Sequence, residues 1–321
     1  MKNIKRILSL TLVLLIMIIS TACNSNDSSK KITLASGGTS GTYYGFSGVI
    51  AQRLNEVLKD KMKINVVSTG ASKANVQMID DGDADIAILQ NDVMSYAYNA
   101  TDMFEGNTPI TSFSAIASCY PESIQIIANK SITKISDLKG KRVSVGDAGS
   151  GTEFNAKQIL EIYGMDIDSD IIKNNQSFAD SCDSLKNGTL DAAFITAGHP
   201  TVAVTELASN YDFNIIPLDS THIDQLINKY GFYAPVTIEK DSYPVLTDDV
   251  QTVAVMATFI ASNKLDEDTV YNFTKGLFEE KGNFQHQKAS LLSLETGVSG
   301  IAIPFHSGAA KYYSENGISI Q

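Results

Sequence analysis

The chain has 321 residues, 43% of them hydrophobic, and a formal net charge of −11 at pH 7. This hydrophobic content is ordinary for a globular protein, and the length suits one large or two medium lobes. The acidic excess argues against nucleic acid and anionic lipid surfaces as partners. Its four histidines have no companion metal-binding motif, so we expect no metal site and no cofactor.

Residues 1–22 have the features of a secretory signal peptide. A basic start precedes an apolar run from Ile7 to Ile19, and small residues follow. This run has 13 residues, fewer than the roughly 20 that a helix needs to span a bilayer. The position of Cys23 resembles a bacterial lipobox, so we expect cleavage before Cys23, its lipidation, and anchoring to the outer face of the cytoplasmic membrane. Ordinary cleavage near Ala22, which would release a secreted protein, is the alternative.

The segment after the cleavage site, residues 23–31, is rich in Ser, Asn and Lys and predicts a flexible tether. Removal of the signal peptide takes away three basic residues and no acidic one, so the mature chain has a net charge of −14. The remaining cysteines, Cys119 and Cys182, could form one disulfide outside the cell. They lie in segments that we expect to be apart, so we favour two buried free thiols.

A pattern of strand, glycine-containing loop and helix occurs twice along the chain. Apolar strands at 32–35 and 142–145 each precede a small-residue loop and an amphipathic helix. Segments 81–89 and 187–195 also match, each with a helix stopped by Gly, then Asp, then a short strand. The copies are offset by 110 residues at the serines of the loops and by 106 residues at the aspartates. Two lobes of related architecture follow from these similar offsets.

The alternation of short apolar strands with amphipathic helices predicts an α/β fold with a largely parallel sheet in each lobe. We therefore expect a two-lobe periplasmic-binding-protein fold with a hinge and an interlobe ligand cleft. Lobe 1 is expected to contain residues 32–118 and 234–321, and lobe 2 residues 119–233. We expect the chain to cross from lobe 1 to lobe 2 in a strand that breaks near Pro121 and to return to lobe 1 before Val236.

The two loops Ser40-Gly41-Thr42 and Ser150-Gly151-Thr152 are the central predicted ligand site. Glycine allows close approach of the backbone to a ligand, and each loop leads into a helix N-terminus with unsatisfied N–H groups. Such loops suit a carboxylate or another anion. Helix capping alone would explain one such loop, so the prediction depends on the match between the two.

Further ligand residues are expected where strands end, because open α/β sheets bind ligands there. Tyr43 could form a wall of the cleft, with core packing as its alternative, and Tyr233 is a weaker candidate. The mature chain has only two arginines, both expected on the surface, so no guanidinium clamp is evident. The other candidates at strand ends are Ala71, Ser72, Gln90, Asp92, Thr196, Gly198 and Pro200.

Several segments, in this order along the chain, resemble motifs of the TAXI family, the TRAP-associated extracytoplasmic immunogenic solute-binding proteins. The resemblance is collinear from about Ile32 to Gly317. It implies the two-lobe fold and delivery of the ligand to a TRAP-type permease driven by an ion gradient. It also implies a small carboxylate ligand similar to glutamate, glutamine or 2-oxoglutarate. The segments are GGTSGTYY (37–44), QND (90–92), YPE (120–122), DLKGKRVSVG (137–146), SGT (150–152), TAGHP (196–200) and IPFHSGA (303–309).

Three other functions are alternatives. A secreted hydrolase would need a nucleophile with a base, but neither loop has a G-x-S-x-G elbow, and His199 beside Ser150 would have no marked acidic partner. We therefore expect no enzyme. A sensor subunit for a membrane receptor and the binding protein of an ATP-driven importer remain open, because partner surfaces leave little trace in one sequence.

Overall fold

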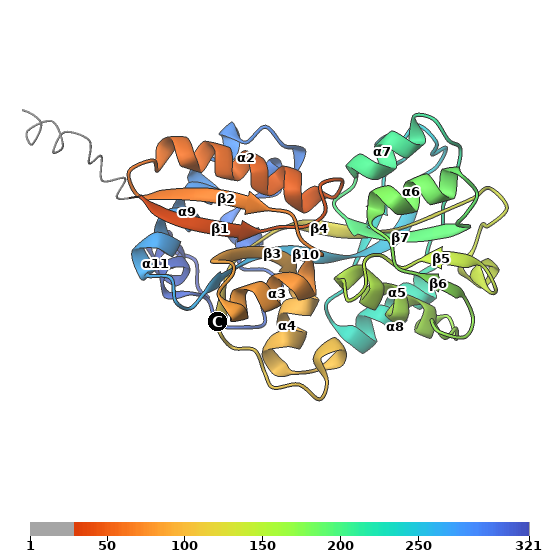
Figure 1. Ribbon diagram of the computed structural model, residues 1–321, viewed down its shortest axis with the longest axis horizontal. Helices are drawn as coiled ribbons and strands as arrows, with labels where there is room; N and C mark the ends of the chain where they lie inside the picture. Colours follow the sequence, from red (N-terminus) through yellow and green to blue (C-terminus); the bar gives the residue numbers. More distant parts are fainter. Residues whose placement is uncertain (1–28, 321) are drawn as a thin grey trace, which may run out of the picture.

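The computed structural model describes residues 29–320, so the predicted signal peptide, Cys23 and most of the tether lie outside the described residues. Ten strands of this part form one mixed sheet in the order β2-β1-β3-β10-β4-β7-β5-β6, with β8 paired to β4 and β9 paired to β10. Figure 1 shows two lobes side by side, joined by β4 and β10. None of the described helices is both long and apolar enough to span a membrane.

Lobe 1 is a parallel three-stranded sheet with helices on both faces. Alternate strand residues point to opposite faces. Leu34 and Ile88 therefore pack with α2, α9 and α11, whereas Ala35 and Leu89 pack with α3 and α4. The elements are β1 (Lys30–Ala35), α2 (Thr42–Val57), β2 (Met62–Val67), α3 (Ser72–Asp81), β3 (Ile86–Gln90), α4 (Asn91–Asn99), α9 (Glu267–Glu279), α10 (Leu294–Gly297) and α11 (Ser307–Glu315).

Lobe 2 repeats this arrangement with shorter strands. Phe194 packs on the side of α5 and α8, and Ile195 packs on the side of α6 and α7. The elements are β5 (Arg142–Ser144), α5 (Gly151–Ile162), β6 (Ile172–Asn174), α6 (Phe178–Lys186), β7 (Ala192–Ala197), α7 (Val202–Ala208), β8 (Asn214–Ile215), α8 (Ser220–Tyr230) and β9 (Ala234–Ile238).

The long strands β4 (Phe113–Ala128) and β10 (Val250–Ser262) run antiparallel through both lobes. In lobe 1, β10 pairs with β3 from Ala257 onward, and in lobe 2 it pairs with β9 up to Ala254. Register shifts in the β4–β10 pair follow Ala257 and Phe259. The connection between the lobes therefore consists of two paired strands at one place in the sheet.

The predicted break at Pro121 is absent, because Pro121 lies inside β4 opposite Met256. The proline is tolerated because pairing of β4 with β7 begins only at Ser123, so no neighbour on that side needs its missing N–H. The expected return to lobe 1 at residue 234 is also corrected. Strand β9 pairs with the lobe 2 half of β10, and Ile238 packs in the lobe 2 core. We place the return within β10.

The sequence repeat corresponds to a repeated backbone motif. Asp85 accepts a hydrogen bond from the backbone N–H of Thr33 at 2.8 Å, and Asp191 accepts one from that of Arg142 at 2.9 Å. The backbone N–H of Asp85 in turn donates to the carbonyl oxygen of Thr33, and that of Asp191 donates to the carbonyl oxygen of Arg142, both at 2.9 Å. The two lobes therefore connect the helix end to the first strand in the same way.

The two described cysteines are free and buried, which confirms the favoured expectation. Cys119 lies in the core of lobe 1, and Cys182 lies in the core of lobe 2. Burial raises the pKa of the Cys182 thiol to about 12 and that of Cys119 further. Both thiols therefore act as small apolar core groups.

Candidate functional site

A cavity of about 40 Å³ lies between the lobes, where the two predicted loops meet. Thr42 from lobe 1 and Thr152 from lobe 2 both line it, and Glu122 of the connecting strand β4 lines it between them. In this closed arrangement the cavity has no room for a peptide or an oligosaccharide. The complete lining is Gly37, Gly38, Gly41, Thr42, Tyr43, Ala71, Gln90, Glu122, Gly151, Thr152, Phe178, Thr196 and Ala197.

Two helices begin at this cavity. The N-cap of α2 is Gly41, which has no side chain to cap the helix, so the first N–H groups of α2 are not satisfied by a side-chain cap. The N-cap of α5 is Ser150, whose hydroxyl accepts a hydrogen bond from Glu153 N–H at 3.2 Å. Both helix dipoles direct their positive ends toward the cavity wall. The α2 end offers more free donors.

The structure is closed, with hydrogen bonds between the lobes around the cavity. Thr42 Oγ1 donates to the carbonyl oxygen of Gly198 at 3.0 Å, and Ala203 N–H donates to that of Ser40 at 3.3 Å. Lys288, only 8% exposed, donates from Nζ to the carbonyl oxygen of His199 at 2.5 Å. Lobe 1 therefore holds the loop that follows β7.

Gly151 marks the closest contact between the lobes at the cavity. A Cβ atom at this position would lie 2.0 Å from Gln90 Oε1 and 2.5 Å from its Cδ. Real Cβ atoms do not approach other atoms so closely, so a larger residue would displace Gln90 or separate the lobes. The glycine of the second loop is thus required by the closed arrangement itself.

A buried polar network supports the wall formed by Gln90. Its Nε2 donates to Asn155 Oδ1 at 2.7 Å and to Asp92 Oδ1 at 3.2 Å. Asn155 Nδ2 in turn donates to Asp92 Oδ2 and to the hydroxyl of Tyr233, both at 2.9 Å. Burial raises the pKa of Asp92 to about 6, although its hydrogen bonds oppose this shift. The network joins both lobes behind the cavity.

Glu122 is the one carboxylic acid in the cavity lining. It is 2% exposed and accepts a hydrogen bond on Oε2 from the hydroxyl of Tyr43. Burial raises the pKa of this carboxyl to about 8. Glu122 was not among the ligand residues predicted from the sequence. The sequence feature that could have identified it is an acidic residue inside the apolar segment that forms β4.

The structure places eight of the fifteen predicted site residues in the cavity lining and the others behind or beside it. The carbonyl groups of Ser40 and Gly198 form interlobe bonds, Ser72 accepts a bond from Gln90 N–H, and Asp92 and Tyr233 belong to the buried network. Ser150 caps α5, and Pro200 borders a separate surface hollow. The lining residues that were not selected are Gly37, Gly38, Glu122, Phe178 and Ala197.

A Ser–His–Glu chain lies close to the site. His199 Nδ1 is 2.6 Å from Ser123 Oγ, and its Nε2 is 3.2 Å from Glu239 Oε2. Ser123 is 0% exposed on the connecting strand, so a substrate cannot reach its hydroxyl in this structure. The chain therefore fixes the imidazole of His199 between the connecting strand and Glu239. Ser150, the serine considered for a hydrolase, caps a helix instead.

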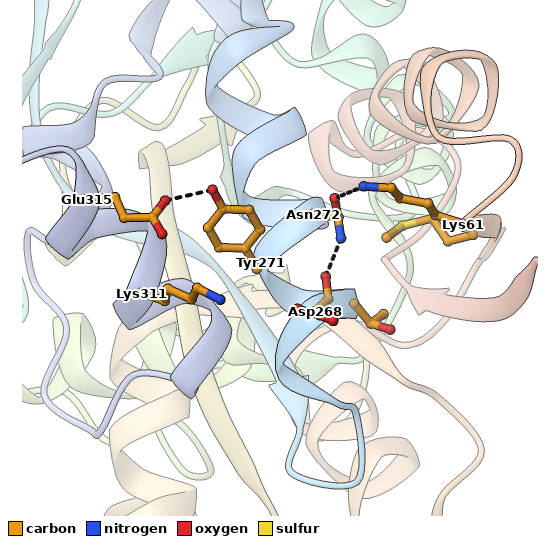
Figure 2. Close-up of a pocket in the computed structure, with 8 residues that line it drawn as sticks. Lys61, Asp268, Tyr271, Asn272, Lys311 and Glu315 are labelled. Atoms are coloured by element: carbon orange, nitrogen blue, oxygen red, sulfur yellow. Dashed lines mark hydrogen bonds between the residues drawn. The ribbon is translucent and has the colours of Figure 1, made fainter.

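A larger hollow of about 510 Å³ lies on the outer side of lobe 1, and Figure 2 shows its lining. Tyr271 and Asn272 of α9 point into it between Lys61 and Glu315. Lys61 bonds to Asn272 at 2.7 Å, and Tyr271 bonds to Glu315 at 2.7 Å. This hollow shares no residue with the interlobe cavity, and most of its polar side chains already have partners, either within the lining or, for Lys311 and Thr269, in Glu267 and Asp266. We therefore take the smaller interlobe cavity as the candidate site.

Residues 34–317 match the sequence model of the NMT1-like family. The chain belongs to the NMT1-like family. This NMT1-like chain is also similar in fold to solved structures. One is a protein from Bordetella bronchiseptica RB50, with 14% identity, coverage of 91% of this chain and 83% of the other, and a TM-score of 0.55.

Two further structures of similar fold are named for their ligands. PhnD1 from Prochlorococcus marinus (MIT 9301), in complex with methylphosphonate, has 12% identity, coverage of 90% and 97%, and a TM-score of 0.51. The alkanesulfonate-binding protein SsuA from Xanthomonas axonopodis pv. citri, bound to MOPS, has 14% identity, coverage of 89% and 83%, and a TM-score of 0.51. The expected two-lobe periplasmic-binding-protein fold is confirmed.

The assignment to the TAXI family is corrected by these comparisons. The family model that matches is the NMT1-like one, and the similar structures include phosphonate and alkanesulfonate binders. Glycine loops before helices, which are two of the segments that carried the resemblance, serve anion binding in many families.

Proposed function

We propose that this NMT1-like protein is an extracytoplasmic solute-binding protein that delivers a small molecule to an ATP-driven importer. The observation that carries the proposal is the meeting of two matched glycine loops, one from each lobe, at a single closed cavity. Neither lobe alone forms this cavity. A ligand held there would contact both lobes at once and would favour the closed state.

The mechanism follows from this differential contact. In an open state, the bonds from Thr42 to Gly198 and from Lys288 to His199 would be broken, and the loops would be exposed to solvent. A ligand that docks on one loop gains the second set of contacts only when the lobes close, so it shifts the population toward the closed form. The importer then recognises a surface that exists only when both lobes meet.

Membrane attachment through Cys23 is part of the proposal. Cys23 precedes β1 by only seven residues, so a lipid on its thiol would hold the protein within a short distance of the membrane. A Cys23→Ala variant should appear in the soluble fraction of cells, whereas the wild-type protein should stay with membranes. Retention of the variant on membranes would show that a lipid on Cys23 does not anchor the protein.

Native mass spectrometry of the protein purified from its source cells tests ligand binding. We expect one small molecule bound per chain. If no molecule co-purifies and no compound from a metabolite extract raises the melting temperature, the solute-binding proposal fails. Uptake of the identified molecule into vesicles tests the importer class. Uptake should persist with an uncoupler while internal ATP is maintained; loss of uptake under these conditions would indicate an ion-gradient permease.

A further inference from the structure

The Glu122 carboxyl has one oxygen that no described residue satisfies. Tyr43 donates to Oε2, and no hydrogen bond from the described residues reaches Oε1. The side chain is 2% exposed, and the residue lines the cavity. Oε1 is not fully enclosed by protein atoms, so it is accessible from the cavity and can accept a hydrogen bond from a donor there. In a binding site, the ligand is the natural source of that donor.

The nearest basic side chain does not supply it. Lys288 acts on the Glu122 carboxyl electrostatically, but its Nζ is held by the carbonyl oxygen of His199 at 2.5 Å, and no ion pair with Glu122 occurs among the described residues. The two arginines pair elsewhere, Arg53 with Glu280 and Arg142 with Asp191. The negative charge of ionised Glu122 therefore has no direct counterion in the described part of the chain.

The opposite requirement holds at the helix end in the same cavity. The first N–H groups of α2 begin at Thr42 and Tyr43, and Gly41 leaves them without a side-chain cap. These donors and the helix dipole favour a negative group. One small cavity thus has a wall that accepts hydrogen bonds, at Glu122, and a wall that donates them, at the start of α2.

We infer that Glu122 determines specificity and that the site selects a small zwitterion, with an ammonium group on Glu122 and one anionic group at the α2 N-terminus. This inference rests on the proposed solute-binding function and gives it a ligand class. The hydroxyl of Tyr43 holds the Glu122 carboxyl in place through Oε2, so that Oε1 faces the ligand. Tyr43 is thus a positioning residue for Glu122.

The same chemistry disfavours doubly charged anions. None of the residues that line the cavity is Lys or Arg. Once Glu122 is ionised, a phosphonate dianion would bring two negative charges next to it without a basic residue in the lining to offset them. Selection of a zwitterion therefore separates this site from the methylphosphonate-bound structure to which the fold is similar.

Protonation of Glu122 provides a second, independent readout. Burial raises its pKa to about 8, so the empty closed site holds a largely protonated carboxyl at pH 7. An ammonium group on Oε1 would favour the ionised form, and binding would release a proton. The titratable groups around Glu122 are Tyr43 of α2, Tyr120 of β4, Asp92 of α4 and Lys288 of the turn at 287–291.

The test uses isothermal titration with matched probes. These are the standard α-amino acids, the carboxylic acids that lack the amino group, the amines that lack the carboxyl group, and methylphosphonate. We expect at least one amino acid to bind, with an affinity at least tenfold above those of its two truncated counterparts and of methylphosphonate. Comparable affinity for a carboxylic acid or methylphosphonate, or no binding by any amino acid, overturns the inference.

Two variants complete the test. Glu122→Gln keeps the shape and can still accept from Tyr43, so we expect a folded protein with at least tenfold lower amino-acid affinity and no proton release in buffers of different ionisation enthalpy. Tyr43→Phe keeps the carboxyl but removes the hydroxyl that holds it, so it should lower amino-acid affinity less than Glu122→Gln does and should still release a proton on binding. Unchanged affinity and proton release in Glu122→Gln overturn the role of Glu122. A co-purified molecule without an ammonium group overturns the zwitterion inference alone and leaves solute binding intact.

Discussion

Thr42 at the start of α2 donates a hydrogen bond to the carbonyl oxygen of Gly198 in the other lobe, at 3.0 Å. The same loop of lobe 2 receives Lys288 from lobe 1 at the next carbonyl. These two bonds lie beside the cavity and join segments separated by 156 and 89 residues. Two successive backbone carbonyl groups of this loop therefore accept the hydrogen bonds that hold the lobes together.

Removal of the Lys288 ammonium should weaken the closed state. A hydrogen bond to a charged group contributes about 1.5–3 kcal/mol, so Lys288→Met should lower ligand affinity by roughly tenfold or more. Titration of the ligand identified from the native protein measures this change. Lys275→Met is the control, because Lys275 is exposed and only 3.9 Å from Glu279. Equal affinity in Lys288→Met and the control would show that this bond does not hold the lobes together.

The stability contribution of Glu122 should fall as pH rises. A carboxyl whose pKa is raised by folding stabilises the folded state below its ordinary pKa, and this contribution is lost as pH rises through the folded value, here about 8. Three histidines, His199, His286 and His306, have pKa values lowered by partial or full burial, and they act in the opposite direction near pH 6.5. Because the wild type and Glu122→Gln contain the same histidines, the histidine effect cancels in the difference between their melting temperatures.

We expect this difference, wild type minus Glu122→Gln, to decrease from pH 6 to about pH 8 and to level off above that in the ligand-free protein. Asp92→Asn should alter the profile mainly below pH 7, because the pKa of Asp92 is raised only to about 6. Melting curves at half-unit pH steps measure both effects. A difference that is constant, or that grows with pH, would contradict the burial of Glu122 without a direct counterion.

Gly308 at the start of α11 tests the packing of lobe 1. A Cβ atom there would lie 2.3 Å from the carbonyl oxygen of Glu267 and 2.6 Å from the backbone nitrogen of Tyr271, both in α9. Backbone atoms of a helix cannot move aside easily, so Gly308→Ala should cost about 1–3 kcal/mol of the free energy of unfolding. Gly282→Ala, with no atom within 4 Å, is the control in denaturant titrations. Equal stability of the two variants would refute this contact.

The lobes and the two loops could be predicted because their signals are local. Short segments of sequence contain the apolar strands and the glycines that end helices. They also contain the repeated aspartates, Asp85 and Asp191, and each of these features has a direct physical cause. The course of the long connecting strands could not be predicted in the same way. Pro121 reads as a break in a sequence, and only the absence of a β7 neighbour beside it explains why the strand continues.

The chemistry of the site was also only partly predictable. The loops around Gly41 and Gly151 are visible as motifs, whereas Glu122, Asn155 and Lys288 act through contacts with segments distant along the chain. Their roles depend on the closing of two lobes, which no local pattern records. Asp92 and Tyr233 show the converse. Asp92 was predicted as a ligand residue from its strand-end position and Tyr233 as an aromatic candidate near the return between the lobes, but burial places both in the supporting network.

Gly151→Ala tests most directly whether a small molecule is held between the lobes at the meeting of the two loops. Its Cβ would meet Gln90 Oε1 at 2.0 Å, whereas Gly48→Ala adds a Cβ with no atom within 4 Å. Both variants and the wild type are purified from source cells and weighed by native mass spectrometry. We predict one bound small molecule in the wild type and in Gly48→Ala, and none in Gly151→Ala. Equal retention of the molecule by folded Gly151→Ala would contradict the account.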